Sequence, residues 1–268
     1  SALGPAEWLG CISLNSPDDG YYFEADSATP NTITMRNSIA WNSSRVGFNI
    51  SSSGFSNVLL ENLTSGQAGR TSSADAFRMT NVLSGTLRNL IAYDFTRYGL
   101  NLNIQPSYTD TFRTTGVANY NQTTPTLGVR TTNPLADGTP PSIKYIPRIE
   151  PGSTLSASGY GGADYGANVI KRYGTDGTFF GEAGYNTLTS MDLWPWPNED
   201  RIKTELATSS TRGFAAPGQT LTDYIWGFLG NASPVPKLTS IAPSTGTAGV
   251  VTAGVTLTGS RFTQAGAG

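Results

Sequence analysis

One short apolar segment occurs three times in the chain, as Gly47-Phe48-Asn49-Ile50, Ala76-Phe77-Arg78-Met79 and Gly99-Leu100-Asn101-Leu102. Gly20-Tyr21-Tyr22-Phe23 has the same form and precedes them. A second series alternates with the first and comprises Met35-Arg36-Asn37-Ser38-Ile39, Leu60-Glu61-Asn62-Leu63-Thr64 and Leu87-Arg88-Asn89-Leu90-Ile91. The copies recur at intervals of roughly 23–29 residues, a period typical of solenoid proteins. Each period holds strand patterns and no helical pattern, so the sequence predicts an all-β fold, a right-handed parallel β-helix with one coil per repeat.

Alternation within these segments predicts which side chains face the core. Alternate residues of a strand point to opposite sides, and parallel coils place equivalent residues above one another, so apolar columns bury surface along the stack. The expected inward columns are Tyr21, Phe48, Phe77 and Leu100; Phe23, Ile50, Met79 and Leu102; and Met35, Leu60, Leu87 and Phe112. The expected outward columns are Tyr22, Asn49, Arg78 and Asn101, facing solvent, and Arg36, Glu61, Arg88 and Arg113.

Asn37, Asn62 and Asn89 fall at one register, at an expected bend between strands. Stacked side-chain amides can hydrogen-bond along such a column and satisfy the bent backbone. This structural ladder resembles the asparagine ladder of pectate-lyase-like β-helices. The resemblance implies a scaffold on which many carbohydrate lyases and hydrolases are built.

Composition restricts the class of protein. Only 13% of the 268 residues are charged and the net charge is −2, which argues against a nucleic-acid partner. No apolar run is long enough to span a membrane. The chain has no histidine and one cysteine, so imidazole ligands, histidine-based triads and an internal disulfide are excluded. Such uncharged, loop-rich β proteins are typical of the cell exterior, and we expect an extracellular or cell-surface location, with no cofactor and no metal site.

The sequence predicts three regions: β-helix coils over 1–141, C-terminal strands and a helical cap over 142–233, and a linker with immunoglobulin-like strands over 234–268. A hairpin is expected over 167–181 around Asp176-Gly177, and helices from Glu199 to about Leu206 and over Leu221–Leu229. The run Trp194-Pro195-Trp196-Pro197-Asn198-Glu199-Asp200-Arg201 and its surroundings resemble a C-terminal segment of bacterial secreted β-helix repeat proteins. That resemblance implies a class of protein and no chemistry.

The last region contains the elements Pro243-Ser244-Thr245-Gly246 and Thr258-Gly259-Ser260-Arg261-Phe262. Together they resemble the opening of an IPT/TIG immunoglobulin-like domain. Two strands cannot form an independent sandwich, so apolar residues there require a partner surface. We therefore expect self-association into a homo-oligomer or filament through Val255, Leu257 and Phe262.

Candidate catalytic residues are few. Asp75 and Arg78 are near each other in sequence, and Asp94 and Arg97 follow about one coil later. Carbohydrate lyases of this fold commonly use Ca²⁺-binding carboxylates and a basic residue, but no tight acidic cluster for Ca²⁺ is present. Surface ion pairs explain the same residues, and the sequence leans against catalysis.

Trp194 and Trp196 have two interpretations. Their aromatic faces suit sugar CH groups and could form a glycan-binding platform, or they could close the open end of the coil stack. The favoured function is a structural or adhesive β-helix protein, a building block of a surface assembly. The alternatives are polysaccharide cleavage by a lyase or hydrolase and non-catalytic glycan binding, with a polysaccharide as partner.

Overall fold

The computed structural model describes residues 6–24, 31–51, 53–114, 119–175, 178–179, 181–196, 199–205, 216–245 and 254–262. The chain divides into two compact units, Ser1–Met191 and Asp192–Gly268. The first unit contains the coils together with the segment that follows them. The second contains two short helices and a two-stranded sheet.

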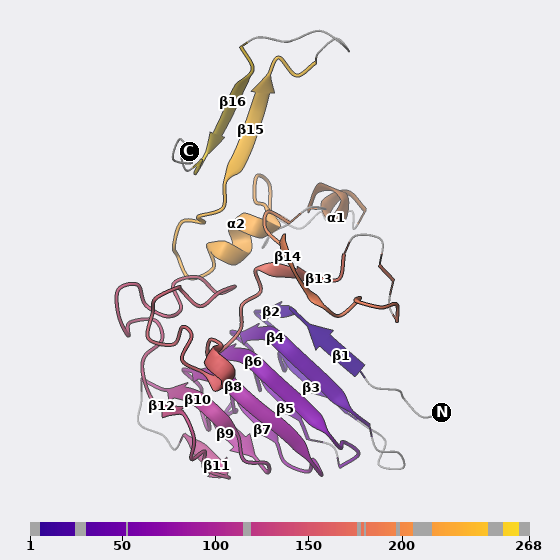
Figure 1. Ribbon diagram of the computed structural model, residues 1–268. Helices are drawn as coiled ribbons and strands as arrows, with labels where there is room; N and C mark the ends of the chain where they lie inside the picture. The colour runs from indigo at the N-terminus through magenta and orange to yellow at the C-terminus, as the bar shows by residue number, and fades with distance from the viewer. Residues whose placement is uncertain are drawn as a thin grey trace. The chain divides into compact units, whose positions relative to one another are not determined.

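The coils form a parallel β-solenoid made of two sheets, as the repeat predicts (Figure 1). The short-strand sheet has the order β11-β9-β7-β5-β3, and the long-strand sheet has the order β1-β4-β6-β8-β10-β12, with β2 also paired to β4. The short strands are β3 (Tyr21–Phe23), β5 (Phe48–Ile50), β7 (Phe77–Met79), β9 (Leu100–Leu102) and β11 (Tyr120–Gln122). The strands of the other sheet are β1 (Ala6–Leu9), β2 (Ile12–Leu14), β4 (Ile33–Trp41), β6 (Val58–Gly66), β8 (Gly85–Tyr93), β10 (Ser107–Phe112) and β12 (Val129–Arg130).

The expected apolar columns of the short-strand sheet are confirmed. Tyr21, Phe48, Phe77 and Leu100 are paired coil to coil, as are Phe23, Ile50, Met79 and Leu102. The rings of Tyr21 and Phe48, and of Phe48 and Phe77, stack with centroids 5.0 Å apart. Aromatic side chains thus pack along the solenoid axis and exclude water from its interior.

The third inward column is confirmed for Met35, Leu60 and Leu87, but the position predicted for Phe112 is wrong. Ser107 pairs with Arg88, so Phe112 lies five residues further along β10 and pairs with Tyr93, on whose ring it stacks. Arg113 is likewise outside the Arg36, Glu61 and Arg88 column. The sequence pattern of Phe112-Arg113 imitates the earlier Leu-Arg and Met-Arg pairs, but the residue at the bend of this coil is Tyr108.

The asparagine positions carry the bend of the long strands. Asn37, Asn62 and Asn89 have φ angles of 47°, 54° and 56°, a left-handed conformation that asparagine tolerates better than most residues. Tyr108 replaces asparagine in the next coil with a φ angle of 51°. The regular pairing of β4, β6 and β8 is interrupted at these positions and resumes on either side. Each long strand therefore changes direction at its asparagine and continues in the sheet on both sides of the bend.

A segment that we call the strap, residues 159–173, crosses the outer face of the long-strand sheet at these bends. Asn37 Nδ2 donates to Tyr173 Oη and Asn62 Nδ2 to the Asp164 carbonyl, each at 2.9 Å. Asn89 Oδ1 accepts from the Tyr160 backbone N–H at 2.8 Å. Amide contact along the column itself occurs between Asn89 and Asn62, at 3.5 Å. The three asparagines therefore form most of these hydrogen bonds with the strap and one with each other.

The hairpin expected over 167–181 has a different second arm. Strand β13 (Lys171–Tyr173) pairs with β14 (Leu188–Asp192), while Thr178 and Phe179 are not in a strand. Asp176 and Gly177 lie outside the described residues. The intervening loop is therefore longer than the Asp-Gly signal predicted.

The second unit contains α1 (Glu199–Glu205), α2 (Leu221–Trp226) and a hairpin of β15 (Lys237–Ala242) with β16 (Thr256–Ser260). Both helices begin where the sequence predicts, and Thr220 caps α2 by accepting from the Asp223 N–H at 2.9 Å. Helix α2 ends at Trp226, three residues earlier than expected. No helix in the described part of the chain is long and apolar enough to cross a membrane.

Candidate functional site

The first candidate site surrounds Asp75, just before β7. Its side chain is fully buried. Oδ1 accepts from Arg97 Nε at 2.7 Å, and Oδ2 accepts from Arg97 Nη2 at 2.6 Å and Arg78 Nε at 3.0 Å. Asn101 Nδ2 adds a further bond to Oδ2 at 2.9 Å. The structure thus brings together three of the four sequence candidates, Asp75, Arg78 and Arg97.

Asp94 is not part of this cluster. Its Oδ1 accepts from Thr114 Oγ1 at 2.7 Å. The residue that sequence reasoning missed is Asn101, although its register with Arg78 on neighbouring strands was predictable. Asn101 was expected in solvent, as was Asn49, and both are buried. That expectation was wrong because polar partners cover this face: Asn49 Nδ2 donates to Asp19 Oδ2 at 2.6 Å, as Asn101 does to Asp75.

The electrostatics of Asp75 suit a structural ion pair. Burial by itself raises the pKa of this carboxyl, but the hydrogen bonds from Arg97, Asn101 and Arg78 outweigh it and hold the pKa below its usual value. The carboxylate is therefore ionised at neutral pH, and both of its oxygens accept hydrogen bonds. A group in this state has no proton to give, and its burial separates it from solvent. The cluster joins neighbouring coils.

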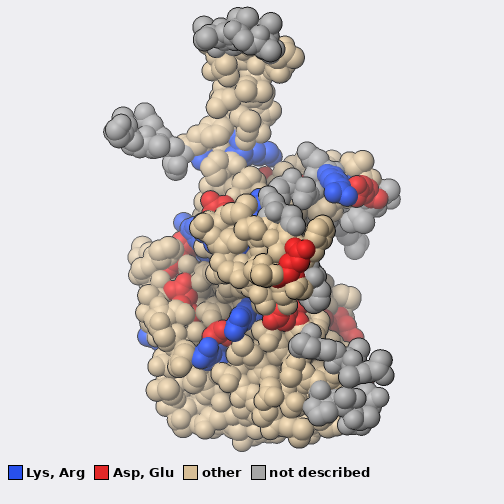
Figure 2. Space-filling view, turned by 45° about the vertical axis from the view of Figure 1, so that its right-hand side comes forward, with Lys and Arg blue, Asp and Glu red and all other residues tan. Residues whose placement is uncertain are grey.

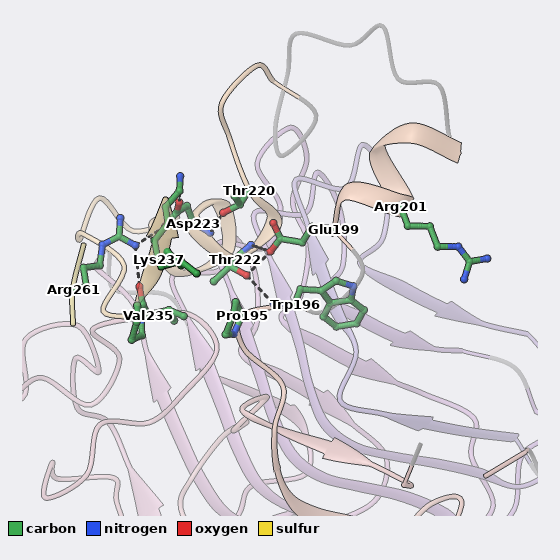
Figure 3. A pocket seen from close by; sticks show the side chains of 12 residues that line it. Pro195, Trp196, Glu199, Arg201, Thr220, Thr222, Asp223, Val235, Lys237 and Arg261 are labelled. Atoms are coloured by element: carbon green, nitrogen blue, oxygen red, sulfur yellow. Dashed lines mark hydrogen bonds and ion pairs between the residues drawn. The ribbon is translucent and has the colours of Figure 1, made fainter. Parts of the chain in front are cut away.

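The second candidate site lies within the second unit. A cleft of about 540 Å³ is bounded by the segment before α1, the start of α2 and the base of the hairpin (Figure 3). Glu199 closes one wall by accepting from the backbone N–H groups of Leu221 at 3.1 Å and Thr222 at 2.8 Å, and from the Thr222 hydroxyl. The backbone N–H of Trp196 donates to Thr222 Oγ1 at 2.9 Å, which fixes the segment that carries this tryptophan.

The two tryptophans considered as a glycan-binding platform or as a plug of the coil stack do not form a flat surface. The ring centroids of Trp194 and Trp196 are 6.0 Å apart with an interplanar angle of 53°. Trp194 contacts the buried Trp226 edge to face at 6.3 Å, so part of its surface belongs to the packing of the unit. Trp196 lines the cleft, and Trp194 is not among its lining residues.

One carboxylate at this cleft holds both strands of the hairpin at their base. Asp223 Oδ1 accepts from Arg261 Nη1 at 2.7 Å, and Oδ2 lies 3.4 Å from Lys237 Nζ. Burial raises the pKa of Asp223, but Arg261, Thr220 and Lys237 together bring it below its usual value. The ionised carboxylate therefore pairs with two cations, one at the start of β15 and one directly after β16.

The hairpin itself has one apolar face. Ile241 pairs with Leu257 and Leu238 pairs with Gly259, so these residues lie on one side of the sheet. The bulge between Leu238 and Ser240 brings Leu238 and Ile241 onto the same side. Lys237, Ser240, Ala242, Thr256, Thr258 and Ser260 pair on the other side.

Two further side chains extend this apolar face. Val255 lies at the alternate position to Leu257, and the Phe262 ring covers Gly259, where a Cβ atom would be 2.4 Å from Phe262 Cζ. Five apolar side chains of this face are 45–57% exposed: Leu238, Ile241, Val255, Leu257 and Phe262. Three of them, Val255, Leu257 and Phe262, are the residues that the sequence marked for assembly. Among the described residues, no group of three or more acidic, histidine or cysteine side chains could hold a metal ion.

Comparisons with known proteins give no relative from which a role could be transferred. No family model matches the chain, and neither a curated protein nor a solved structure matches it.

Proposed function

We propose that the protein is a structural β-helix module of the cell exterior that associates with copies of itself through the apolar face of β15 and β16. The observation that carries the proposal is the exposure of five large apolar side chains on one side of a two-stranded sheet. A lone hairpin is marginally stable in water, and exposed apolar patches commonly mark interaction surfaces. A second hairpin packed against this face would remove these side chains from water.

The charge pattern favours a second copy as the partner. Residues 238–260 contain no charged side chain, so two such hairpins meet without repulsion. Natural sheet edges are usually protected from pairing by lysine or other charges along the strand. The two cations at the base, Lys237 and Arg261, are both paired with Asp223. Nothing in the sequence of this hairpin discourages contact with its own copy.

The surface of the solenoid is compatible with a structural role. Figure 2 shows charged side chains in small groups on a largely uncharged surface in the view shown. The ion pairs Arg36–Glu61 and Arg88–Glu61 bridge adjacent coils at 3.1 Å and 2.6 Å. Together with the Asp75 cluster, they supply cohesion between coils. These contacts support a scaffold function more than a reaction centre.

The test compares substitutions on the two faces of β16. We expect the full chain to associate in a concentration-dependent manner in sedimentation velocity experiments. Leu257→Glu should remain monomeric because it places a charge in the apolar contact, which is costly to bury. Thr258→Glu is the matched control, since it adds the same charge at the adjacent residue on the polar face, and it should associate as the unmodified chain does. The proposal fails if the unmodified chain is monomeric or if both variants associate equally.

A further inference from the structure

The cleft of the second unit has the dimensions and the walls of a small-ligand site. Its volume of about 540 Å³ lies within the range of roughly 300–1,000 Å³ typical of such sites. Figure 3 shows Arg261, Lys237 and Val235 toward one end and Trp196 toward the other, with Pro195 and Thr222 between them. Arg201 also borders the cleft, but its side chain points away and pairs with Glu205 at 2.7 Å. The two ends therefore differ in chemistry.

The acceptors in the cleft are already occupied. Both oxygens of Glu199 accept bonds from the start of α2, and both oxygens of Asp223 face cations. The hydroxyl of Thr222 donates to Glu199 and accepts from the backbone N–H of Trp196. A ligand that enters this cleft finds few carboxylate or hydroxyl acceptors for its own donors.

Donors remain available at the cationic end. Within the described part of the chain, the hydrogen bonds of Arg261 all come from Nη1, to Asp223 and to the Val235 carbonyl. The guanidinium has further N–H groups in the same plane, which suit a carboxylate. Lys237 Nζ is 3.4 Å from Asp223, a long contact, and about two fifths of its side chain is exposed. A charged acceptor is therefore the group that this end can bind.

The opposite end offers apolar surface. Trp196 lines it, and Pro195, between the two ends, adds aliphatic surface. Pyranose rings present CH groups that pack against aromatic faces, whereas their hydroxyls point outward. We infer that this cleft binds an acidic saccharide, with a carboxylate at Lys237 and Arg261 and a sugar ring at Trp196. The inference does not rest on self-association, because the groups assigned to the ligand are Lys237, Arg261 and Trp196; Leu238 is the one side chain that both borders the cleft and belongs to the apolar face of the hairpin.

The experiment is isothermal titration calorimetry of the full chain with tetragalacturonate, maltotetraose and tetra-aspartate. We expect tetragalacturonate to bind at least about tenfold more tightly than the other two, with an affinity that falls as NaCl rises. Lys237→Gln should weaken tetragalacturonate binding about tenfold, whereas Lys237→Arg should retain it. Arg201→Gln is the matched control, because it removes a cation whose side chain points away from the cleft. The affinity of this variant for tetragalacturonate should be unchanged.

Three results would overturn the inference. They are equal affinity for the acidic and neutral saccharides, equal affinity for tetra-aspartate, and unaltered tetragalacturonate binding in Lys237→Gln. Circular dichroism shows whether each variant is folded. If Lys237→Gln does not fold, Trp196→Phe provides the second test and should weaken binding of both saccharides. Unchanged saccharide binding in Trp196→Phe would contradict the proposed contact between the sugar ring and Trp196.

Discussion

Asp110 and Asp75 are both fully buried aspartates, yet their surroundings shift their acidity in opposite directions. Two guanidinium groups and an amide surround Asp75. Asp110 on β10 accepts from the Thr132 N–H at 2.9 Å and the Thr132 hydroxyl at 3.2 Å. Burial raises the pKa of Asp110 to about 7; the Thr132 bonds and Arg130 oppose this shift and the charge of Asp137 adds to it. Burial favours the neutral form of both carboxyl groups, so the number of cationic donors decides whether the pKa rises or falls.

The raised pKa of Asp110 predicts a pH dependence of stability. In the unfolded chain its pKa is close to 3.8, so between that value and about 7 the folded protein binds one proton more. The stability contributed by this proton is present below pH 3.8 and is lost as pH rises toward 7. A difference of about three pKa units corresponds to at most about 4 kcal/mol. Asp110→Asn should therefore gain stability relative to the unmodified protein by up to this amount between about pH 4 and about pH 8.

Urea unfolding followed by circular dichroism across this pH range measures the effect. The side-chain amide introduced by Asp110→Asn retains an oxygen that can accept from Thr132, and this amide cannot ionise. The difference in unfolding free energy between the two proteins should increase steadily with pH and level off above about pH 7. Parallel stability profiles for the two proteins would show that the Asp110 carboxyl does not carry this shift.

At the scale of the element, the strap depends on side chains that project from the bends of the long strands. Asn62 has a φ angle of 54° and its amide donates to the Asp164 carbonyl. The backbone N–H of Ala167 donates to Thr64 Oγ1 at 2.9 Å, and Gly166 approaches so closely that a Cβ atom there would be 2.6 Å from Ile91 Cδ1. The bend thus serves two purposes: it turns the strand and presents hydrogen-bonding groups to the strap.

Substitution by glycine separates these two purposes. Asn62→Gly keeps a residue suited to positive φ but removes the amide bound to the strap, so we expect a loss of about 1–2 kcal/mol in unfolding free energy. Asn57→Gly is the matched control, because Asn57 has a similar φ of 55° and is exposed, so the bond that its Oδ1 accepts from Ser84 Oγ at 3.2 Å contributes little. The unfolding free energy of the Asn57→Gly variant should fall by no more than about 0.5 kcal/mol. Hydrogen exchange should also accelerate at strap amides in Asn62→Gly, and equal losses at the two sites would contradict this role of Asn62.

At the scale of the whole molecule, the coils and the hairpin differ in how they bury apolar surface. Each coil covers its neighbour, so the cluster that includes Phe48, Phe77, Leu90 and Leu100 is continuous along the stack. The hairpin of β15 and β16 has no comparable layer within the described part of its unit. The coils therefore have a hydrophobic core of their own, whereas the hairpin of β15 and β16 exposes an apolar face.

Deletion of residues 237–268 should separate folding from association. We expect the truncated chain to keep the β-sheet circular dichroism and the thermal unfolding midpoint of the coils, because all members of their core cluster lie before residue 121. Association should be lost, as measured by sedimentation velocity at matched protein concentrations. Association that persists after the deletion would assign it to another surface, and loss of the coil signal would show that the coils need this segment to fold.

The sequence by itself determined the solenoid and its columns. Like residues repeat at nearly constant spacing, and parallel stacking converts this spacing directly into contact between coils, as for Phe48 on Phe77. The sequence also predicted the bends at Asn62 and Asn89, because few residue types adopt a left-handed backbone readily. The exposure of Leu257 and Phe262 was predictable because a two-stranded apolar segment has no core of its own.

Only the tertiary structure decided which groups meet where the repeat fails. Phe112 changed register because the loop before β10 has its own length, and the local pattern contains no information about that length. The burial of Asn101 depends on its contact with Asp75, which lies just outside the repeated strand β7. The pairing of β13 with β14 and the cleft beside Trp196 depend on contacts between residues in non-repeating segments. Periodicity fixes neighbours only where the chain repeats; elsewhere the path of each loop and the available partners for buried polar groups fix them.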